Sequence, residues 1–253
     1  MFVRKQLQLL ITLLGALVIS SCGGSDEATV SCSNMAKLTT ELGVLNTKGE
    51  VLGNLIELDP VTKQTAYVGM VTLNPVTDAL ITPISDKANI TSDAGLSVSF
   101  NARLTKSEKA ELTTDLTQNM QLQLKNTNRH QITEPYDVVN RQDNAARIKK
   151  LLTRGKYLVL VDAGNTSEQA TFGLKNGASS AVTLSAGGKS FSFAVTYQCQ
   201  GDLTSQVSAD RARQALAFFK VAEIVKRPDG TLGVIPFPGT LTDYDLSDAT
   251  PSP

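Results

Sequence analysis

Alternating apolar and polar positions predict that most of this chain forms β-strands. Residues 96–104 and 191–197 place apolar side chains at almost every second position, which is typical of a strand with one buried face. Residues 120–125 show the same alternation directly after a helical pattern. Residues 157–161 are apolar without interruption, which indicates a central strand buried on both faces.

Turn signals connect further predicted strands. An Asx-Pro turn occurs twice with nearly the same sequence, in residues 58–62 (LDPVT) and 73–77 (LNPVT). Proline favours a turn, and it cannot donate a hydrogen bond within a central strand. Gly187-Gly188 and the PDG of residues 228–230 are tight-turn signals between apolar runs. The strands expected beside these turns cover residues 55–58, 64–71, 170–174, 181–185, 221–225 and 232–235.

Three segments have helical patterns. Thr105 and Glu108 form the capping-box pattern that begins a helix. Residues 143–154 carry an apolar stripe at helical spacing, and residues 209–217 are expected to form a shorter helix. Because the helices are interspersed among hairpin-connected strands, the predicted fold class is α+β, with a mostly antiparallel sheet and about three helices.

Charge and composition exclude some partners. The chain has 24 Lys+Arg and 24 Asp+Glu, and no cluster of basic residues, so a nucleic-acid partner is not expected. Trp is absent and aromatic residues make up 5% of the chain, so the core depends mainly on aliphatic side chains. The length suits one domain or two small ones, with enough chain to bury a substantial core.

The first residues follow a secretion pattern. A basic segment at residues 1–5 precedes an apolar run that closes on residues 19–24 (ISSCGG). The run falls short of the roughly 20 apolar residues that a membrane-spanning helix needs. This segment resembles the signal peptide and lipobox of bacterial lipoproteins, with an apolar residue three positions before Cys22 and small residues between.

The resemblance implies that the chain is cut before Cys22, that Cys22 receives a diacylglycerol, and that its new amino group is acylated. Several acyl chains together give stable membrane anchoring, since each buried CH₂ contributes about 0.8 kcal/mol. In this family an Asp directly after the lipidated cysteine favours the inner membrane. Gly23 stands there, so the resemblance implies the outer membrane. An ordinary secretory signal with a coincidental cysteine is the alternative.

These patterns together predict an order of segments along the chain. They are a signal peptide at 1–21, a lipidated flexible tether at 22–31, a single α+β domain at 32–237 and a disordered tail at 238–253. The tether composition is small and polar, and the tail is rich in Pro, Thr, Asp and Ser.

Cys32 and Cys199 remain once Cys22 is assigned to the lipid. An even pair of cysteines in an exported chain indicates a disulfide. Closing so long a loop is worth about 5 kcal/mol in the chain-entropy model. Two free thiols or a metal-binding pair are the alternatives. A metal is disfavoured because His130 is the only histidine in the chain.

No residue stands out as catalytic. His130 could be a general base, but its polar neighbours favour a loop residue. Residues 187–190 (GGKS) resemble the end of a phosphate-binding loop but lack its earlier glycine. Two groups of oxygen-bearing side chains could bind a cation, although a turn and a solvated tail explain them better: Asp162 with Asn165, Ser167 and Glu168, and Asp243 with Asp245 and Asp248. No cofactor or metal site is therefore expected.

Two hypotheses for the function remain. The first is a non-enzymatic lipoprotein that presents a binding or assembly domain at the cell envelope, with an envelope protein as the possible partner. The second is a periplasmic hydrolase that uses dispersed carboxylates or an unidentified Ser nucleophile. A convergent polar cluster in a pocket would favour the enzyme. An exposed apolar patch or sheet edge would favour the binding module.

Overall fold

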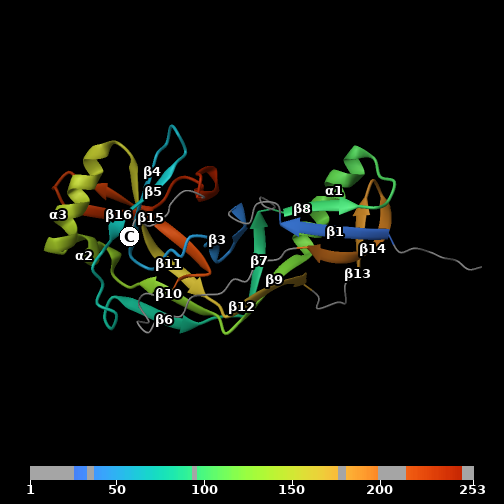
Figure 1. Cartoon of the computed structure of the whole chain (residues 1–253), viewed down its shortest axis with the longest axis horizontal. Coiled ribbons are helices and arrows are strands. Elements are labelled where there is room, and N and C mark those ends of the chain that lie inside the picture. The colour runs from blue at the N-terminus through green and yellow to red at the C-terminus, as the bar shows by residue number, and fades with distance from the viewer. Residues whose placement is uncertain (1–25, 33–36, 93–95, 176–180, 199–214, 247–253) are drawn as a thin grey trace, which may run out of the picture.

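The computed structural model describes residues 26–32, 37–92, 96–175, 181–198 and 215–246. Most described residues lie in β-strands, and the strands pair almost entirely in antiparallel fashion. Three α-helices are present in this part of the chain. The fold is therefore α+β and dominated by strands. Figure 1 shows an elongated molecule with a small four-stranded sheet toward one end and two helices toward the other.

The small sheet has β1 (Asp26–Cys32) as an interior strand. β1 pairs in parallel with β14 (Lys189–Gln198) and antiparallel with β8 (Leu96–Phe100). Helix α1 (Lys106–Asn119) buries Leu112 and Leu116 in the core of this sheet. Its expected capping box is present, because the Thr105 side chain and the Glu108 side chain each bond the other's backbone N–H. The strands, in order across the sheet, are β13 (Ala181–Ala186), β14 (Lys189–Gln198), β1 (Asp26–Cys32) and β8 (Leu96–Phe100).

β1 differs from the sequence-based expectation. Residues 26–31, assigned above to the flexible tether, form most of this strand. Ala28 and Val30 are fully buried, while Glu27, Thr29 and Ser31 are polar. The alternation is that of a strand with one buried face. The strand was missed from the sequence because the segment is short and its small and polar residues match the composition of a linker.

The larger sheet has β11 (Tyr157–Thr166) near its centre. Residues 157–160 of β11 pair with β4 (Asn54–Leu58) along one edge, and residues 163–166 pair with β10 (Asn128–Ile132) along the same edge. β4 also pairs with β5 (Thr65–Met70), and β16 (Leu232–Pro236) pairs with β15. The remaining strands, in order across the sheet, are β12 (Gln169–Leu174), β9 (Met120–Lys125), β7 (Lys87–Ser92), β2 (Thr39–Thr40), β3 (Gly43–Leu45), β15 (Phe218–Lys226), β11 (Tyr157–Thr166), β10 (Asn128–Ile132) and β6 (Ala79–Pro83), with β4 (Asn54–Leu58) beside β11.

Two helices cover one face of this sheet. α2 (Pro135–Asn140) and α3 (Gln142–Leu151) bury Val138, Val139 and Ile148 against strand residues of β4 and β11. α3 continues into a short 3-10 turn, η2 (Leu152–Arg154), and Gly155 follows in the left-handed conformation. The helix expected over residues 143–154 and its glycine cap are therefore confirmed.

The opposite face is covered by the C-terminal segment. Leu241, Tyr244 and Leu246 are buried against β4, β11 and β15, and Leu241 begins the 3-10 turn η4 (Leu241–Asp243). Residues 238–246, expected in a disordered tail, thus form part of the folded body. The segment has too few apolar residues to show a periodic pattern in the sequence. These residues nevertheless pack on the apolar face of the sheet. The helix expected over residues 209–217 lies mostly outside the described residues.

Candidate functional site

β6 is an edge strand with exposed apolar side chains. It pairs with β10 on one side, and no other described strand pairs with it. Leu80 is 50% exposed and Ile81 is 39% exposed. Val76, in the turn before the strand, is 86% exposed. Proteins usually blunt such edges with charges or cover them, because a free strand edge is a template for pairing.

The hydrogen bonds at the two ends of β6 show which backbone groups face outward. Thr133 N–H donates to the Asp78 carbonyl at 2.9 Å, and Ile84 N–H donates to the Thr127 carbonyl at 3.1 Å. Both bonds belong to the register that pairs β6 with β10. Bonded and non-bonded pairs alternate along an antiparallel ladder. Even-numbered residues of β6 therefore bond to β10, and odd-numbered residues direct their backbone groups to the free edge.

Ala79, Ile81 and Pro83 are the odd-numbered residues of this strand. Ala79 and Ile81 each offer one backbone N–H and one C=O to the free edge, whereas Pro83 offers only a C=O. A proline is tolerated at this position because its missing N–H would face solvent. The free edge is thus short, and its last outward N–H belongs to Ile81.

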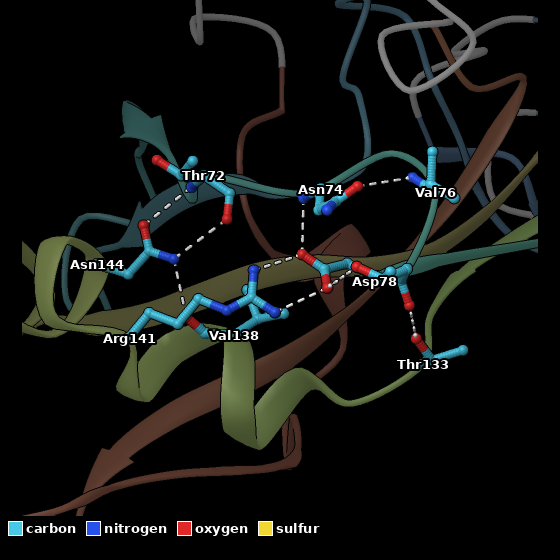
Figure 2. Close-up of polar contacts among 9 residues, drawn as sticks. Thr72, Asn74, Val76, Asp78, Thr133, Val138, Arg141 and Asn144 are labelled. Carbon is cyan, nitrogen blue, oxygen red and sulfur yellow. Dashed lines mark hydrogen bonds and ion pairs between the residues drawn. The ribbon is translucent and has the colours of Figure 1, made fainter.

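An ion pair fixes the residue that begins this edge (Figure 2). Asp78 directly precedes β6, and both of its carboxylate oxygens accept bonds from Arg141, which lies between α2 and α3. The Nη2–Oδ1 distance is 2.7 Å. The N–H of Asn74 donates to Oδ2 at 2.7 Å and the Thr77 hydroxyl donates to Oδ1 at 3.1 Å. The carboxylate therefore ties the turn, the start of β6 and the two helices together.

The electrostatics of Asp78 suit an anchor. The hydrogen bonds from Arg141 lower the pKa of Asp78 to about 2, against burial, which raises it. A carboxyl group with this pKa stays ionised at every physiological pH and is a poor proton acceptor. The ion pair therefore positions the edge strand, and Asp78 is unsuited to proton transfer.

A second polar contact holds the segment that leads to the turn. The side chain of Asn144, on α3, accepts a bond from the Thr72 N–H at 2.9 Å. It donates to the Thr72 carbonyl at 3.3 Å and to the Val138 carbonyl at 2.8 Å (Figure 2). Asn144 is buried, so it satisfies backbone groups that would otherwise lose their partners. The route from β5 to β6 is thereby fastened at two points to the helices.

Both Asx-Pro turns present a valine at the tip. Asp59 Oδ1 accepts the Val61 N–H at 2.9 Å, and Asn74 Oδ1 accepts the Val76 N–H at 3.0 Å. Val61 is 87% exposed. The turn chemistry predicted from the recurring phrase is confirmed. The first turn leads into β5, which pairs with β4 alone among the described strands, and the second turn leads into β6.

His130 is in a different environment from the one expected. It lies in β10, not in a loop, and its side chain is buried. Nε2 is 3.0 Å from the Thr166 hydroxyl, and burial lowers the pKa of the ring. Alternate positions of β10 face the core, so a polar-looking segment (NRHQI) still forms a strand. A buried histidine bonded to a threonine hydroxyl is a core residue.

Asp162 also departs from its predicted setting. It lies inside β11, where the register with β15 shifts between Val161 and Ala163, and not in a turn after the strand. Burial raises its pKa to about 6, and the nearby Lys220 acts in the opposite direction. Its carboxylate accepts bonds from its own N–H and that of Ala163. Bulges often re-aim side chains near functional sites.

The other suggested cation ligands do not converge. Asn165 Nδ2 donates to the Leu42 carbonyl at 3.1 Å, and the Ser167 hydroxyl donates to the Lys125 carbonyl at 3.1 Å. Within the described ranges, no group of three His, Cys, Asp or Glu side chains could hold a metal ion. Asp243 and Asp245 lie in the folded C-terminal segment, and Asp248 lies outside the described residues.

Residues 187–190 form the tight turn that the sequence predicted. Ala186 pairs with Lys189, and Gly187 and Gly188 both have positive φ, as a two-residue type I′ turn requires. The Lys189 ammonium lies 3.4 Å from Glu108 Oε1. This lysine is therefore engaged by a carboxylate of α1.

A small pocket lies near the end of the C-terminal segment. It has room for about one water molecule. Glu50 is buried at its wall, accepts a bond from Asn54 Nδ2 at 2.6 Å, and has a pKa that burial raises. The pocket is too small for an organic substrate. Its lining residues are Leu45, Asn46, Thr47, Lys48, Glu50, Ile56, Thr65, Phe219 and Leu246.

Cys32 is the last residue of β1, and Cys22 and Cys199 lie outside the described residues. The parallel register of β1 and β14 runs to the pair Ser31 and Gln198. Cys32 and Cys199 directly follow these two residues in the sequence. The register therefore supports the predicted disulfide, which stays a prediction.

Comparison with known proteins adds little. No protein-family model matches the chain, and no curated protein matches it. Among solved structures, it is similar to a bacterial gasdermin from Bradyrhizobium tropiciagri, with a TM-score of 0.34 and 10% identity, over 78% of this chain and 87% of that one. A likeness this distant carries no functional argument. In the described part of the chain, no helix has the length and apolar character needed to cross a membrane.

Proposed function

We propose that this chain is a membrane-anchored lipoprotein whose folded body binds an envelope protein partner. The anchor is the lipidated Cys22, and the binding element is β6. The partner contributes an extended segment that adds a strand to the free edge of β6. This mode of recognition takes its affinity from main-chain hydrogen bonds and its specificity from alternate side chains.

The observation that carries the proposal is the combination of free backbone groups and exposed apolar side chains on one edge. Ala79 and Ile81 direct backbone groups outward, and Leu80 exposes half of its surface. The Asp78–Arg141 pair holds this edge in place before any partner arrives. A preorganised edge avoids part of the ordering cost of association.

A partner strand fits this edge better than a second copy of β6 does. If two copies paired antiparallel about Ile81, Ala79 of each copy would lie opposite Pro83 of the other. Pro83 has no N–H, so the Ala79 carbonyl of each copy would lose its bond. A strand with an N–H at that position satisfies every outward group. We therefore assign the edge to a different protein chain.

The test uses a photo-crosslinking amino acid at position 80 in cells, in three backgrounds. The unmodified background should give an adduct with a partner protein. Ile81→Pro removes one outward N–H and no bond to β10, so it should abolish the adduct while the protein stays folded. Ile81→Ala keeps the N–H and should retain the adduct at a reduced level.

Thr82→Pro is the matched control for backbone direction. It removes an inward N–H that bonds β10, so it should lower the thermal stability, unlike Ile81→Pro. An adduct of unchanged intensity in a folded Ile81→Pro protein would contradict strand addition. An adduct with twice the mass of the chain would show that the occupant of the edge is a second copy of this protein, which would contradict the assignment to a different chain.

A periplasmic hydrolase is the second candidate, and Asp162 is the observation that favours it. A partly buried carboxyl with a pKa of about 6 beside a strand bulge could act as a general acid or base near neutral pH. This candidate predicts that Asp162→Asn abolishes the biological role in a complementation assay while leaving the crosslink at position 80 intact.

A further inference from the structure

The face of the larger sheet that the C-terminal segment covers continues beyond this cover. On this face, Val159 of β11 and Ile235 of β16 both lie opposite Glu223 of β15. Residues directly opposite each other in a ladder point to the same side of the sheet. Val159 is fully buried in the core beneath the C-terminal segment, whereas Ile235 is 41% exposed. The face is therefore closed over β11 and open at β16.

Three aromatic rings follow one another at the margin of this open face. The Tyr157 and Phe237 rings meet edge to face with their centroids 5.8 Å apart, and the Phe237 and Tyr244 centroids are 6.1 Å apart. Tyr244 is buried, whereas Tyr157 is 36% exposed. The row of rings thus leads from the covered part of the face to solvent.

Glu223 lies on the strand between the two ends of the exposed ring pair. Tyr157 is two residues before Val159 on β11, so it shares the face of Glu223. Phe237 is two residues after Ile235 and packs on the same core. The carboxylate is therefore flanked by apolar and aromatic side chains on both neighbouring strands.

The Glu223 carboxylate lacks a counter-ion in the described part of the chain. Burial raises its pKa, and no ion pair joins it to a described residue. A charge that is partly withdrawn from water without a partner costs free energy. A cation brought to this face would offset that cost.

Two lysines near the row of rings already have partners. Lys63 Nζ lies 5.1 Å from the centroid of the Tyr244 ring, and Lys156 Nζ lies 3.5 Å from Asp59 Oδ2. The first contact shows that a ring of this row can hold an ammonium group. The more exposed ring, that of Tyr157, has no such cation among the described residues.

We propose that the open face around Glu223 binds an arginine side chain of a partner protein. The guanidinium group pairs with the Glu223 carboxylate and stacks on the ring of Tyr157, while its aliphatic stem packs on Ile235. Arginine suits this surface because its planar group bonds a carboxylate at two points and also stacks on aromatic rings. Arginine and tyrosine are also enriched among the residues that dominate protein interfaces.

This surface is separate from the free edge of β6. β15 and β16 lie on one side of β11, whereas β10 and β6 lie on the other. The two surfaces also use different chemistry, because strand addition at β6 depends on backbone groups and the Glu223 surface depends on a charged side chain. The inference therefore goes beyond the proposed function.

The test uses the full-length protein in detergent micelles, with 4-fluorophenylalanine at position 237 as a fluorine NMR probe. It is titrated with a capped Gly-Arg-Gly peptide and with the same peptide containing citrulline, which has nearly the shape of arginine without its charge. We expect a saturable shift with the arginine peptide and about tenfold weaker binding of the citrulline peptide. Equal affinities, or no saturable shift, would overturn the proposal.

Variants assign the preference to particular groups. Glu223→Gln should abolish the preference for arginine without lowering the thermal stability, because it removes an unpaired charge from a partly buried position. Tyr157→Leu removes one ring and should weaken binding of the arginine peptide several-fold. Asp243→Asn is the matched control, because it removes an exposed carboxylate of the neighbouring η4 and should leave the preference unchanged. A preference that survives Glu223→Gln, or is lost equally in Asp243→Asn, would overturn the proposal.

A photo-crosslinking amino acid at position 235 tests the occupant in cells. The adduct should contain a different protein, attached within a few residues of an arginine, and should lose most of its intensity in the Glu223→Gln background. An adduct with a second copy of this chain, or one of unchanged intensity in Glu223→Gln, would overturn the assignment. Because β6 lies on the other side of β11, either outcome leaves strand addition at β6 to its own test.

Discussion

Two aspartates show how the same side chain takes opposite roles in this protein. Asp78 is paired with Arg141 and its pKa falls to about 2, whereas burial raises the pKa of Asp162 to about 6. The sequence identifies the Asx-Pro turn before Asp78, because turn chemistry is local. It cannot identify Arg141, which is 63 residues away, since such a pairing depends on how the helices pack.

Asp78→Asn should destabilise the fold. Its lowered pKa means that the ionised form contributes stability above the unfolded pKa near 3.8, and that this contribution is lost as pH falls through about 2. Arg141 is 43% exposed, so solvent screens the pair and the expected loss at pH 7 is about 1–2 kcal/mol. Urea unfolding measures it.

A double-mutant cycle with Arg141→Gln isolates the pair. If the two side chains act together, the double variant loses less than the sum of the single losses. Additive losses would mean that Asp78 and Arg141 do not stabilise the edge as a pair.

Asp162→Asn should have the opposite effect. The raised pKa means that the folded state carries a cost that sets in as pH rises from about 3.8 and is complete above about 6. Removing the charge should stabilise the protein at pH 7.5 by up to about 3 kcal/mol, and the gain should vanish near pH 4. Thermal unfolding at both pH values checks this. A gain that is equal at both values would contradict the account.

At the scale of elements, strict alternation was the reliable signal. Alternation in the sequence predicts β8, β9 and β14, and the capping box predicts the start of α1. Strands without a clear alternation were missed. β6 (ALITP) is too short and ends in proline, and β10 (NRHQI) buries His130 among polar residues. The binding element proposed here is therefore one that periodicity could not show.

The pairing of β1 with β14 leads to a prediction about the cysteines. Cys32 and Cys199 follow Ser31 and Gln198, which are partners in the parallel register. Neighbouring strands lie about 5 Å apart, within the Cα separation that a disulfide allows. We expect non-reducing peptide mapping to find Cys32 linked to Cys199. Recovery of both residues as free thiols from freshly purified protein would refute the pairing.

At the scale of the whole molecule, the expected α+β class with mostly antiparallel strands agrees with the structure. The segment boundaries were set from composition and missed β1 and the C-terminal cover, because short folded segments can share the composition of linkers. Leu241, Tyr244 and Leu246 show that a few well-placed apolar side chains suffice.

The lipid anchor at Cys22 is the central claim, since the proposed function places the protein at the membrane through it. The most direct measurement is the partition of Cys22→Ala between membrane and soluble fractions after a carbonate wash, at matched expression. The account predicts that the unmodified protein stays with the membranes and that the variant is released as folded, soluble protein. A variant that remains in the washed membrane fraction would contradict it.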